Sequence, residues 1–150
     1  MREPALASAS EQGDLVCKQK AKLRFTGRIR SLRLRNCARI RIEDAELDYL
    51  QIDESTADLN NVKVANTRNA LLVRDSTITG TTMNVTGEIG IHADNSLLDL
   101  AGVSVKGSKQ ALKLSEDSTI YFSVSELESP ELAVDAHDIW GAAVREKSQL

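Results

Sequence analysis

NALLVRDSTITG, residues 69–80, reads as a β-strand followed by a turn, and close copies of it return along the chain. The clear copies start at positions 50, 71, 91, 112 and 132, so the spacing between them is nearly constant. A looser copy precedes them and starts at position 32. A nearly fixed period of this length is typical of repeat folds. The first residues of the copies, beginning with the looser one, are Leu32, Leu50, Leu71, Ile91, Leu112 and Leu132.

Inside each copy, apolar residues alternate with polar ones, which is the periodicity of β-strands. The copy that starts at Leu50 shows this alternation at Leu50 and Ile52, and again at Val62 and Val64. Helices need apolar residues at intervals of three and four, and the middle of the chain is instead rich in Thr, Val, Ile and Ser. We therefore expect an all-β fold: a single-stranded parallel β-helix of about 5–6 coils, with roughly 20–21 residues and three short strands per coil.

The repeats resemble those of right-handed parallel β-helix proteins of the pectate-lyase-like superfamily, in which a small-residue turn precedes each strand. The resemblance covers roughly residues 32–144 and implies a right-handed fold rather than an activity. Bactofilins, which form filaments, are similar in general plan only, because their repeats are shorter and richer in glycine. The stretch that carries the resemblance, residues 69–123, is NALLVRDSTITGTTMNVTGEIGIHADNSLLDLAGVSVKGSKQALKLSEDSTIYFS.

Two other solenoids have similar periods. Left-handed hexapeptide helices need about 18 residues per coil, which the wider spacing of the later copies contradicts. Pentapeptide-repeat helices have coils that match the observed spacing and remain an alternative over the first part of the chain. The positions that fit this second pattern are Cys37, Ile42, Leu47, Ile52 and Ala57, and beyond Val62 the pattern reaches threonines.

The chain has 150 residues, of which 41% are hydrophobic, enough for the core of one domain. Residues 1–13 are small and polar, and we expect a disordered lead there. Residues 14–150 are expected to form one β-helix domain, with a terminal cap or tail near residues 130–150 that is either a last coil or a capping helix. The longest apolar runs are far shorter than a transmembrane helix.

Stacking of coils places equivalent residues in columns at the expected turns. One column contains Cys37 and a series of serines, whose hydroxyls suit hydrogen bonds to nearby backbone groups. Acidic residues precede the serines and suit either exposed turns or a site for calcium or a cationic partner. We favour turn chemistry and predict no bound metal or cofactor. The acidic turn residues are Asp53, Asp75, Asp94 and Asp117.

Cys17 and Cys37 are the only cysteines and are separated by one expected coil length. If both side chains face the same way on adjacent coils, their Cα atoms lie within the range of a disulfide. Two buried thiols are the alternative. The choice between them depends on the compartment, which the sequence does not specify.

Charge is distributed unevenly along the chain. Residues 18–42 contain ten basic residues and no acidic one, whereas residues 43–150 contain 19 acidic and 8 basic residues. The basic residues mostly alternate with apolar ones, so we expect them on the outer surface of strands whose inner surface is core. The candidate binding residues of this basic segment are Lys22, Arg24, Arg28, Arg30, Arg33, Arg35, Arg39 and Arg41.

Three kinds of partner fit this charge pattern. A second copy of the chain could add to either end of the solenoid, an arrangement that a basic N-terminal end and an acidic body favour. An anionic polymer or surface could bind the basic residues. Nucleic acid is disfavoured, because aromatic residues are 3% of the chain and offer few stacking surfaces.

The sequence predicts no catalytic residues, because no group of Asp, Arg or Lys assembles on one sheet and no long loop walls a cleft. A non-catalytic structural or assembly module, possessing charged ends through which it self-associates, is therefore the first expectation. A module that binds an anionic polymer or surface is the second. A carbohydrate-active β-helix enzyme is the third.

Overall fold

The computed structural model describes residues 12–115, 117–129, 134–135 and 139–146, and all secondary structure in these residues is β. It contains the strands β1 Gln12–Lys18, β2 Arg24–Arg35, β3 Ile40–Asp53, β4 Thr56–Ala65, β5 Asn69–Arg74, β6 Thr77–Asp94, β7 Leu97–Leu114, β8 Thr119–Ser129, β9 Val134–Asp135 and β10 Ile139–Glu146.

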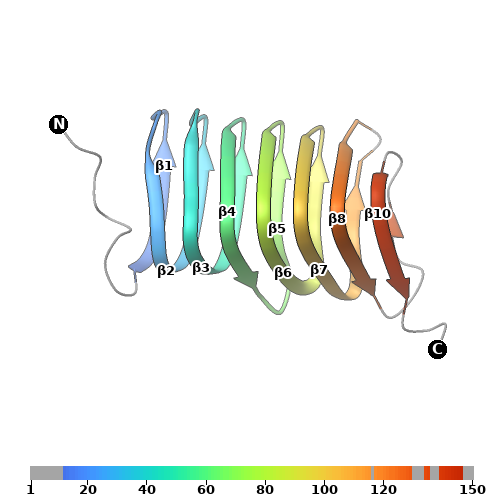
Figure 1. The fold of residues 1–150 in the computed structure, drawn as a ribbon. Coiled ribbons are helices and arrows are strands. Elements are labelled where there is room, and N and C mark those ends of the chain that lie inside the picture. The colour runs from blue at the N-terminus through green and yellow to red at the C-terminus, as the bar shows by residue number, and fades with distance from the viewer. Residues whose placement is uncertain (1–11, 116, 130–133, 136–138, 147–150) are drawn as a thin grey trace.

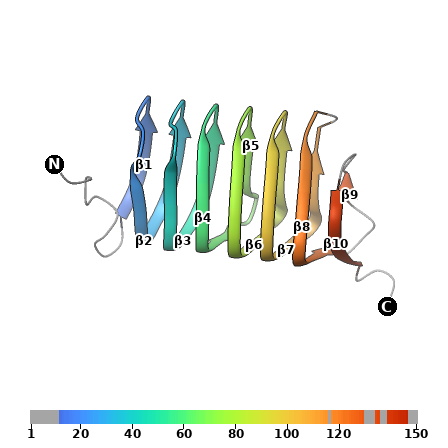
Figure 2. The same ribbon diagram turned by 45° about the horizontal axis from the view of Figure 1, so that its top comes forward.

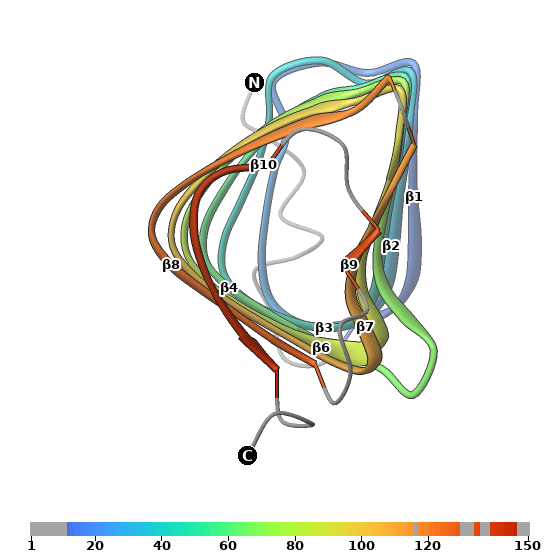
Figure 3. The ribbon, with the colours of Figure 1, turned by 90° about the vertical axis from the view of Figure 1, so that its right-hand side faces the viewer.

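The strands stack as a parallel β-solenoid of about 5 turns, as the sequence predicts (Figures 1 and 2). Every strand pairing in the described residues is parallel. The main path of pairing runs β1-β2-β3-β4-β6-β7-β8-β10, while β5 pairs with β3 and β6, and β9 pairs with β7. Seen from the C-terminal end, the chain turns anticlockwise as it approaches the viewer, so the solenoid is right-handed (Figure 3). The described part of the chain contains no helix, and so none that is long and apolar enough to cross a membrane.

Each coil has three sides. We name them in chain order: face A holds the segments that open each coil, face B the segments that follow, and face C the segments that close it. Face A comprises residues 24–26, 40–43, 56–60, 77–81, 97–101, 119–123 and 139–140. Face C comprises β1, β5, β9 and residues 31–35, 50–53, 89–94 and 110–114.

Coil length is less uniform than the repeat spacing predicts. Leu47 lies opposite Val64, whereas Leu50, only a few positions further on, lies opposite Leu71. The added residues form the connection between β4 and β5 at 66–68, which bulges from the cross-section in Figure 3. The predicted period therefore describes the middle coils only, because the early coils are shorter and the coil from Leu97 to its partner Thr119 is longer.

The last repeat is displaced by two residues from its predicted register. Leu112 pairs with Val134 rather than with the predicted Leu132, which lies outside the described residues. Further along the chain, β10 pairs with β8 in parallel. Of the two predicted alternatives, residues 139–146 therefore form part of a last coil and not a capping helix. The predicted N-terminal lead also lies outside the described residues, except that Gln12 and Gly13 belong to β1.

Residues with left-handed backbone conformation turn the chain at two corners of the coils, one residue at most corners and two at the first corner of the N-terminal coils, namely Gln19 with Lys22 and Asn36 with Arg39. The first corner precedes face A and the second follows it. Because one residue suffices for a turn, strands such as β6 continue around the second corner, and the predicted three short strands per coil merge into longer ones. The first corner contains Asn36, Glu54, Asp75 and Asn95, with φ of 47–56°, and the second contains Asp44, Asn61, Thr82 and Gly102, with φ of 50–64°.

Inward-facing side chains form columns in the core. Leu50, Leu71, Ile91 and Leu112 follow one another in register, and all are 0% exposed. Burying each such side chain contributes about 1.5–3 kcal/mol. The pentapeptide alternative is wrong, because the threonines that its register reaches are exposed. These threonines are Thr67, Thr77 and Thr82.

A ladder of buried serines closes the first corner, which confirms the predicted hydroxyl-to-backbone bonding. Ser55 N donates to Ser76 Oγ at 3.0 Å, Ser76 N donates to Ser96 Oγ at 3.2 Å, and Ser96 N donates to Ser118 Oγ at 3.0 Å. Ser76 Oγ in turn donates to the carbonyl oxygen of Arg74 at 2.6 Å. Each hydroxyl therefore supplies a buried N–H group of the previous coil with an acceptor.

Replacing Ser76 with alanine is expected to lower the free energy of unfolding by about 1–3 kcal/mol, because the buried N–H of Ser55 loses its acceptor. Urea denaturation followed by circular dichroism measures this. Thr81→Ala, at an exposed position of the same coil, is the control and should change stability by less than about 0.5 kcal/mol. Equal effects of the two substitutions would contradict the role of the ladder.

Thr82→Asn is expected to raise the free energy of unfolding by roughly 0.5–1 kcal/mol, because a β-branched residue is strained at φ 57° and asparagine tolerates this conformation. Asparagine already occupies the equivalent corner position at Asn61. Gly102→Thr places threonine at the same corner one coil later and should lower stability. The denaturation midpoints of both variants test the corner, and a loss of stability in Thr82→Asn would overturn the argument.

Candidate anion-binding face

The residues of the basic segment do not share one face of the solenoid. The basic segment runs along all three sides of the coil, so its cations are distributed around the first two coils. Arg24 and Arg41 lie on face A, and Lys22 and Arg39 lie at the corner where face A begins. The others lie on the remaining sides: Arg28 on face B, and Arg30, Arg33 and Arg35 near or on face C.

Several of these cations are already engaged by the protein. Arg24 pairs with Glu43 at 3.5 Å and Arg28 with Asp48 at 2.8 Å. Arg30 pairs with Asp14 at 3.4 Å, and the Arg33 guanidinium lies 5.7 Å from the centre of the Tyr49 ring. A hydrogen bond from Ser31, followed by the charge of Arg30, lowers the pKa of the Asp14 carboxyl. These contacts leave fewer cations available to a partner than the sequence indicates.

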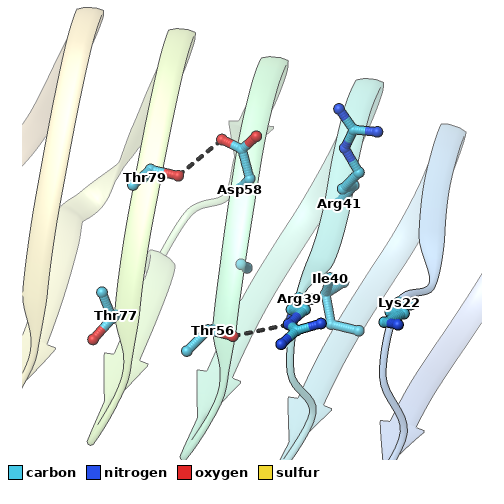
Figure 4. A pocket seen from close by; sticks show the side chains of 9 residues that line it. Lys22, Arg39, Ile40, Arg41, Thr56, Asp58, Thr77 and Thr79 are labelled. Carbon is cyan, nitrogen blue, oxygen red and sulfur yellow. Dashed lines mark hydrogen bonds between the residues drawn. The ribbon is translucent and has the colours of Figure 1, made fainter.

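Lys22, Arg39 and Arg41 form no ion pair within the described part of the chain. They line one end of an open groove of about 540 Å³ on face A (Figure 4). Lys22 and Arg39 lie at the same height at the first corner of neighbouring coils, just before β2 and β3, and Arg41 lies further along, on β3. Three cations that form no ion pair with a described acid therefore gather on two adjacent coils.

Hydroxyl groups continue the row of cations across the next coils. Thr56 and Thr77 follow Arg39 along one row, and Asp58 and Thr79 follow Arg41 along the other (Figure 4). Thr79 Oγ1 donates to Asp58 Oδ1 at 2.9 Å, and Asp58, the one carboxylate of the groove, lies next to Arg41 in register without forming an ion pair with it. Thr56 Oγ1 accepts from the backbone N–H of Arg39 at 2.8 Å. The groove thus presents cations and hydroxyl donors, which suit oxyanions.

The predicted acidic turn residues fall into two neighbouring columns on the first corner. Asp53 and Asp94 share a column with Arg74 between them, and Arg74 Nε lies 2.9 Å from Asp53 Oδ1. The hydrogen bond that Arg74 donates to Asp53 raises the pKa of the guanidinium. In the next column Asn95 Nδ2 donates to Asp75 Oδ1 at 2.8 Å, and Asp117 lines the same hollow.

These acidic side chains are therefore separated by a cation or an amide. Among the described residues, no three His, Cys, Asp or Glu side chains lie together as a group that could hold a metal ion.

Cys17 and Cys37 form a disulfide between the first two coils, and their Cα atoms are 6.6 Å apart. They do not occupy equivalent positions, because Cys17 pairs in register with Leu34 and Cys37 lies slightly further on, at the first corner. The early coils are shorter than the predicted period, which accounts for this offset. Both side chains are buried.

Sequence reasoning did not identify Thr56, Thr77, Thr79 or Asp58 as neighbours of the basic residues. The sequence does contain a signal for these four residues, because each is a polar residue at an outward position in the alternation of apolar and polar residues. The β3–β4 pairs are offset by one residue less than the spacing from Leu32 to Leu50, and this difference brings Thr56 and Asp58 into rows with Arg39 and Arg41. The β4–β6 pairs follow the predicted spacing and add Thr77 and Thr79 to the rows.

Comparisons with protein-family models, with curated proteins and with solved structures found no match for the chain.

His92 lies on face C, between Leu72 and Lys113 in register. Burial, and then the charge of Lys113, lowers the pKa of the imidazole, while Asp94 opposes this and Arg74 adds to it. The unfolded chain therefore binds a proton at higher pH than the folded protein does. The contribution of His92 to stability is complete above pH of about 6.5 and is lost as pH falls through the lowered folded pKa.

Lowering the pH from about 7.5 to about 5 is expected to decrease the free energy of unfolding less in His92→Gln than in the wild type. Lys113→Gln should also reduce this loss, because it removes a charge that lowers the pKa of His92. Urea denaturation at the two pH values measures both effects. An identical loss in the wild type and His92→Gln would contradict this assignment.

Proposed function

We propose that this protein is a non-catalytic module that binds a linear polyanion along face A. The observation that carries the proposal is the cluster of Lys22, Arg39 and Arg41, three cations without an acidic partner in the described residues, beside an open groove. The backbones of adjacent coils are about 4.8 Å apart, so one extended chain of anionic groups can contact cations on both coils. Such contacts raise the rate of association and weaken as salt screens them.

Binding is favoured over catalysis by the composition of the groove. Asp58 is the one carboxylate among the residues that line it, and Thr79 already donates to that carboxylate. General acid–base work at a glycosidic bond needs a pair of carboxyl groups that flank the bond. From the resemblance to pectate-lyase-like proteins we therefore carry over the fold plan and no activity.

A polymer is favoured over a membrane surface by the surroundings of the cations. A peripheral membrane site usually combines cations with exposed apolar side chains that enter the lipid. Among the face A side chains that the structure describes, Leu97 and Tyr121 are the large apolar ones that are exposed, and they lie several coils from Arg41. The three cations themselves are bordered by threonine hydroxyls.

Assembly through the two ends of the solenoid, with or without a resemblance to bactofilins, stays a prediction. The residues that flank the end strands β1 and β10, at 1–11 and 147–150, lie outside the described part of the chain.

The wild type is expected to bind heparin, used as a linear polyanion probe, with an affinity that falls steeply between about 50 mM and about 300 mM NaCl. Arg41→Glu and Arg39→Glu should each weaken binding by about tenfold or more, because each replaces an attraction with a repulsion. Fluorescence anisotropy with labelled heparin measures the dissociation constants.

Arg68→Glu is the matched control, because it changes net charge equally at an exposed residue of the β4–β5 connection, away from the groove. Equal weakening by Arg41→Glu and Arg68→Glu would indicate attraction to net charge alone and reject a site. Binding to phosphatidylserine vesicles without binding to heparin would reject the polymer in favour of a membrane surface.

A further inference from the structure

Like charges lie side by side in the first two coils, on both sides of the first corner. On face C, Lys18 of β1 lies in register with Arg35 of β2, and both side chains are exposed. Where face A begins, Lys22 and Arg39 lie at the same height on neighbouring coils (Figure 4). Since the backbones of adjacent coils are about 4.8 Å apart, the cations of each pair repel one another and lower the stability of the solenoid.

The column on face C that begins with Lys18 and Arg35 relieves such repulsion in its later coils. It continues with Asp53, Arg74 and Asp94, whose charges alternate. Arg74 pairs there with Asp53, whereas Lys18 and Arg35 form no ion pair within the described residues. The first two coils therefore carry neighbouring cations whose repulsion is not offset by an ion pair in the described chain.

The backbone of two of these cations is also in an uncommon conformation. Lys22 and Arg39 have φ of 61° and 55°, in a region that asparagine and glycine adopt at lower cost. Gln19 and Asn36 are the other left-handed residues of the same two turns, so the first corner of these coils is broad (Figure 3). Long basic side chains thus lie where both charge and backbone conformation cost stability, which is common at functional sites.

We propose that a flexible linear polyanion wraps around this corner and crosses from face A to face C over the first two coils. An anion between the coils contacts one cation of each and offsets their repulsion. This path rests on the proposed polyanion site and adds the direction of the polymer and its contacts on face C. The cations along the path, which we call the corner belt, are all exposed and form no ion pair within the described residues: Lys18, Lys20, Lys22, Arg35, Arg39 and Arg41.

Acidic side chains oppose the other direction, along the solenoid axis. In register, Arg35 is followed by Asp53 and Arg41 is followed by Asp58. Two coils beyond Asp58 the same column holds Asp99. The threonines of the groove offer hydroxyl groups but no positive charge. A polymer along the axis leaves the cations after two coils and approaches carboxylates, whereas a polymer that crosses the coils stays among cations.

The path also selects the kind of polymer. Lys18 and Lys22 are four positions apart, as are Arg35 and Arg39, so the chain between the two sides of the corner spans at most about 14 Å. Double-stranded DNA has a persistence length of about 50 nm and is too stiff to follow a corner of this size. A flexible single chain of closely spaced anions, such as polyphosphate, follows it.

Fluorescence anisotropy with labelled polyphosphate at low salt tests the path on face C. Lys18→Glu and Arg35→Glu should each raise the dissociation constant by about tenfold or more, as Arg39→Glu does. Lys113→Glu makes the same charge change at an exposed position of face C several coils away, and should change the constant by less than about threefold. Circular dichroism checks that every variant is folded.

Two variants that each add one acid test the direction of the polymer. Asn36→Glu places the acid inside the corner belt, and the equivalent left-handed position of the next coil already holds Glu54. Thr77→Glu places it in the row of Arg39, two coils further along the axis. A polymer that crosses the coils should lose about threefold or more in affinity from Asn36→Glu and less from Thr77→Glu.

Three outcomes would overturn the wrapped path and leave the site on face A intact. In the first, Lys18→Glu and Arg35→Glu bind no more weakly than Lys113→Glu, while Arg39→Glu still weakens binding. In the second, Thr77→Glu weakens binding at least as much as Asn36→Glu. In the third, duplex DNA or heparin binds and polyphosphate does not. A wild type that binds neither heparin nor polyphosphate would reject the proposed function itself, and the path with it.

Discussion

The parallel backbone hydrogen bonds between successive coils are the constraint on which the rest of the structure depends. They hold each coil in register with the next, and side chains alternate between core and surface with a period of two. A one-residue slip within a strand would move its buried side chains to the surface. Changes in coil length are therefore absorbed at corners, as where the β4–β5 connection lengthens the coil without disturbing the core columns.

The corners change the direction of the chain and also give the backbone N–H groups hydrogen-bond acceptors. A single left-handed residue such as Asp75 or Asn61 redirects the chain within one residue. At the first corner, where the chain leaves the strand ladder, the serine hydroxyls supply acceptors to the N–H groups of the coil before. Turns and ladder together keep the buried backbone paired along the solenoid.

The basic side chains on the surface differ mainly in whether they form ion pairs within the chain. Arg28 and Arg74 are held by carboxylates of neighbouring coils, whereas Arg39 and Arg41 border a groove of hydroxyl groups. An exposed ion pair contributes little to stability, about 0–1 kcal/mol, but it removes a cation from the set that a partner can recruit. Pairing within the chain therefore decides which cations remain available to a partner more than the count of basic residues does.

The sequence by itself determined the parallel β-helix class and the buried positions, because alternation and period express which side of a strand each residue occupies. It also predicted the serine column, because one small polar residue recurs at each turn. Only the tertiary structure decided the coil lengths, the offset of Cys17 from Cys37 and the division of the basic segment among three sides. The physical reason is that neighbours across coils depend on register, and register depends on how many residues each corner consumes. A repeat whose length varies from coil to coil leaves that number open. The row from Arg41 to Asp99 therefore exists only in the stacked coils, although each of its residues is plainly an outward one in the sequence.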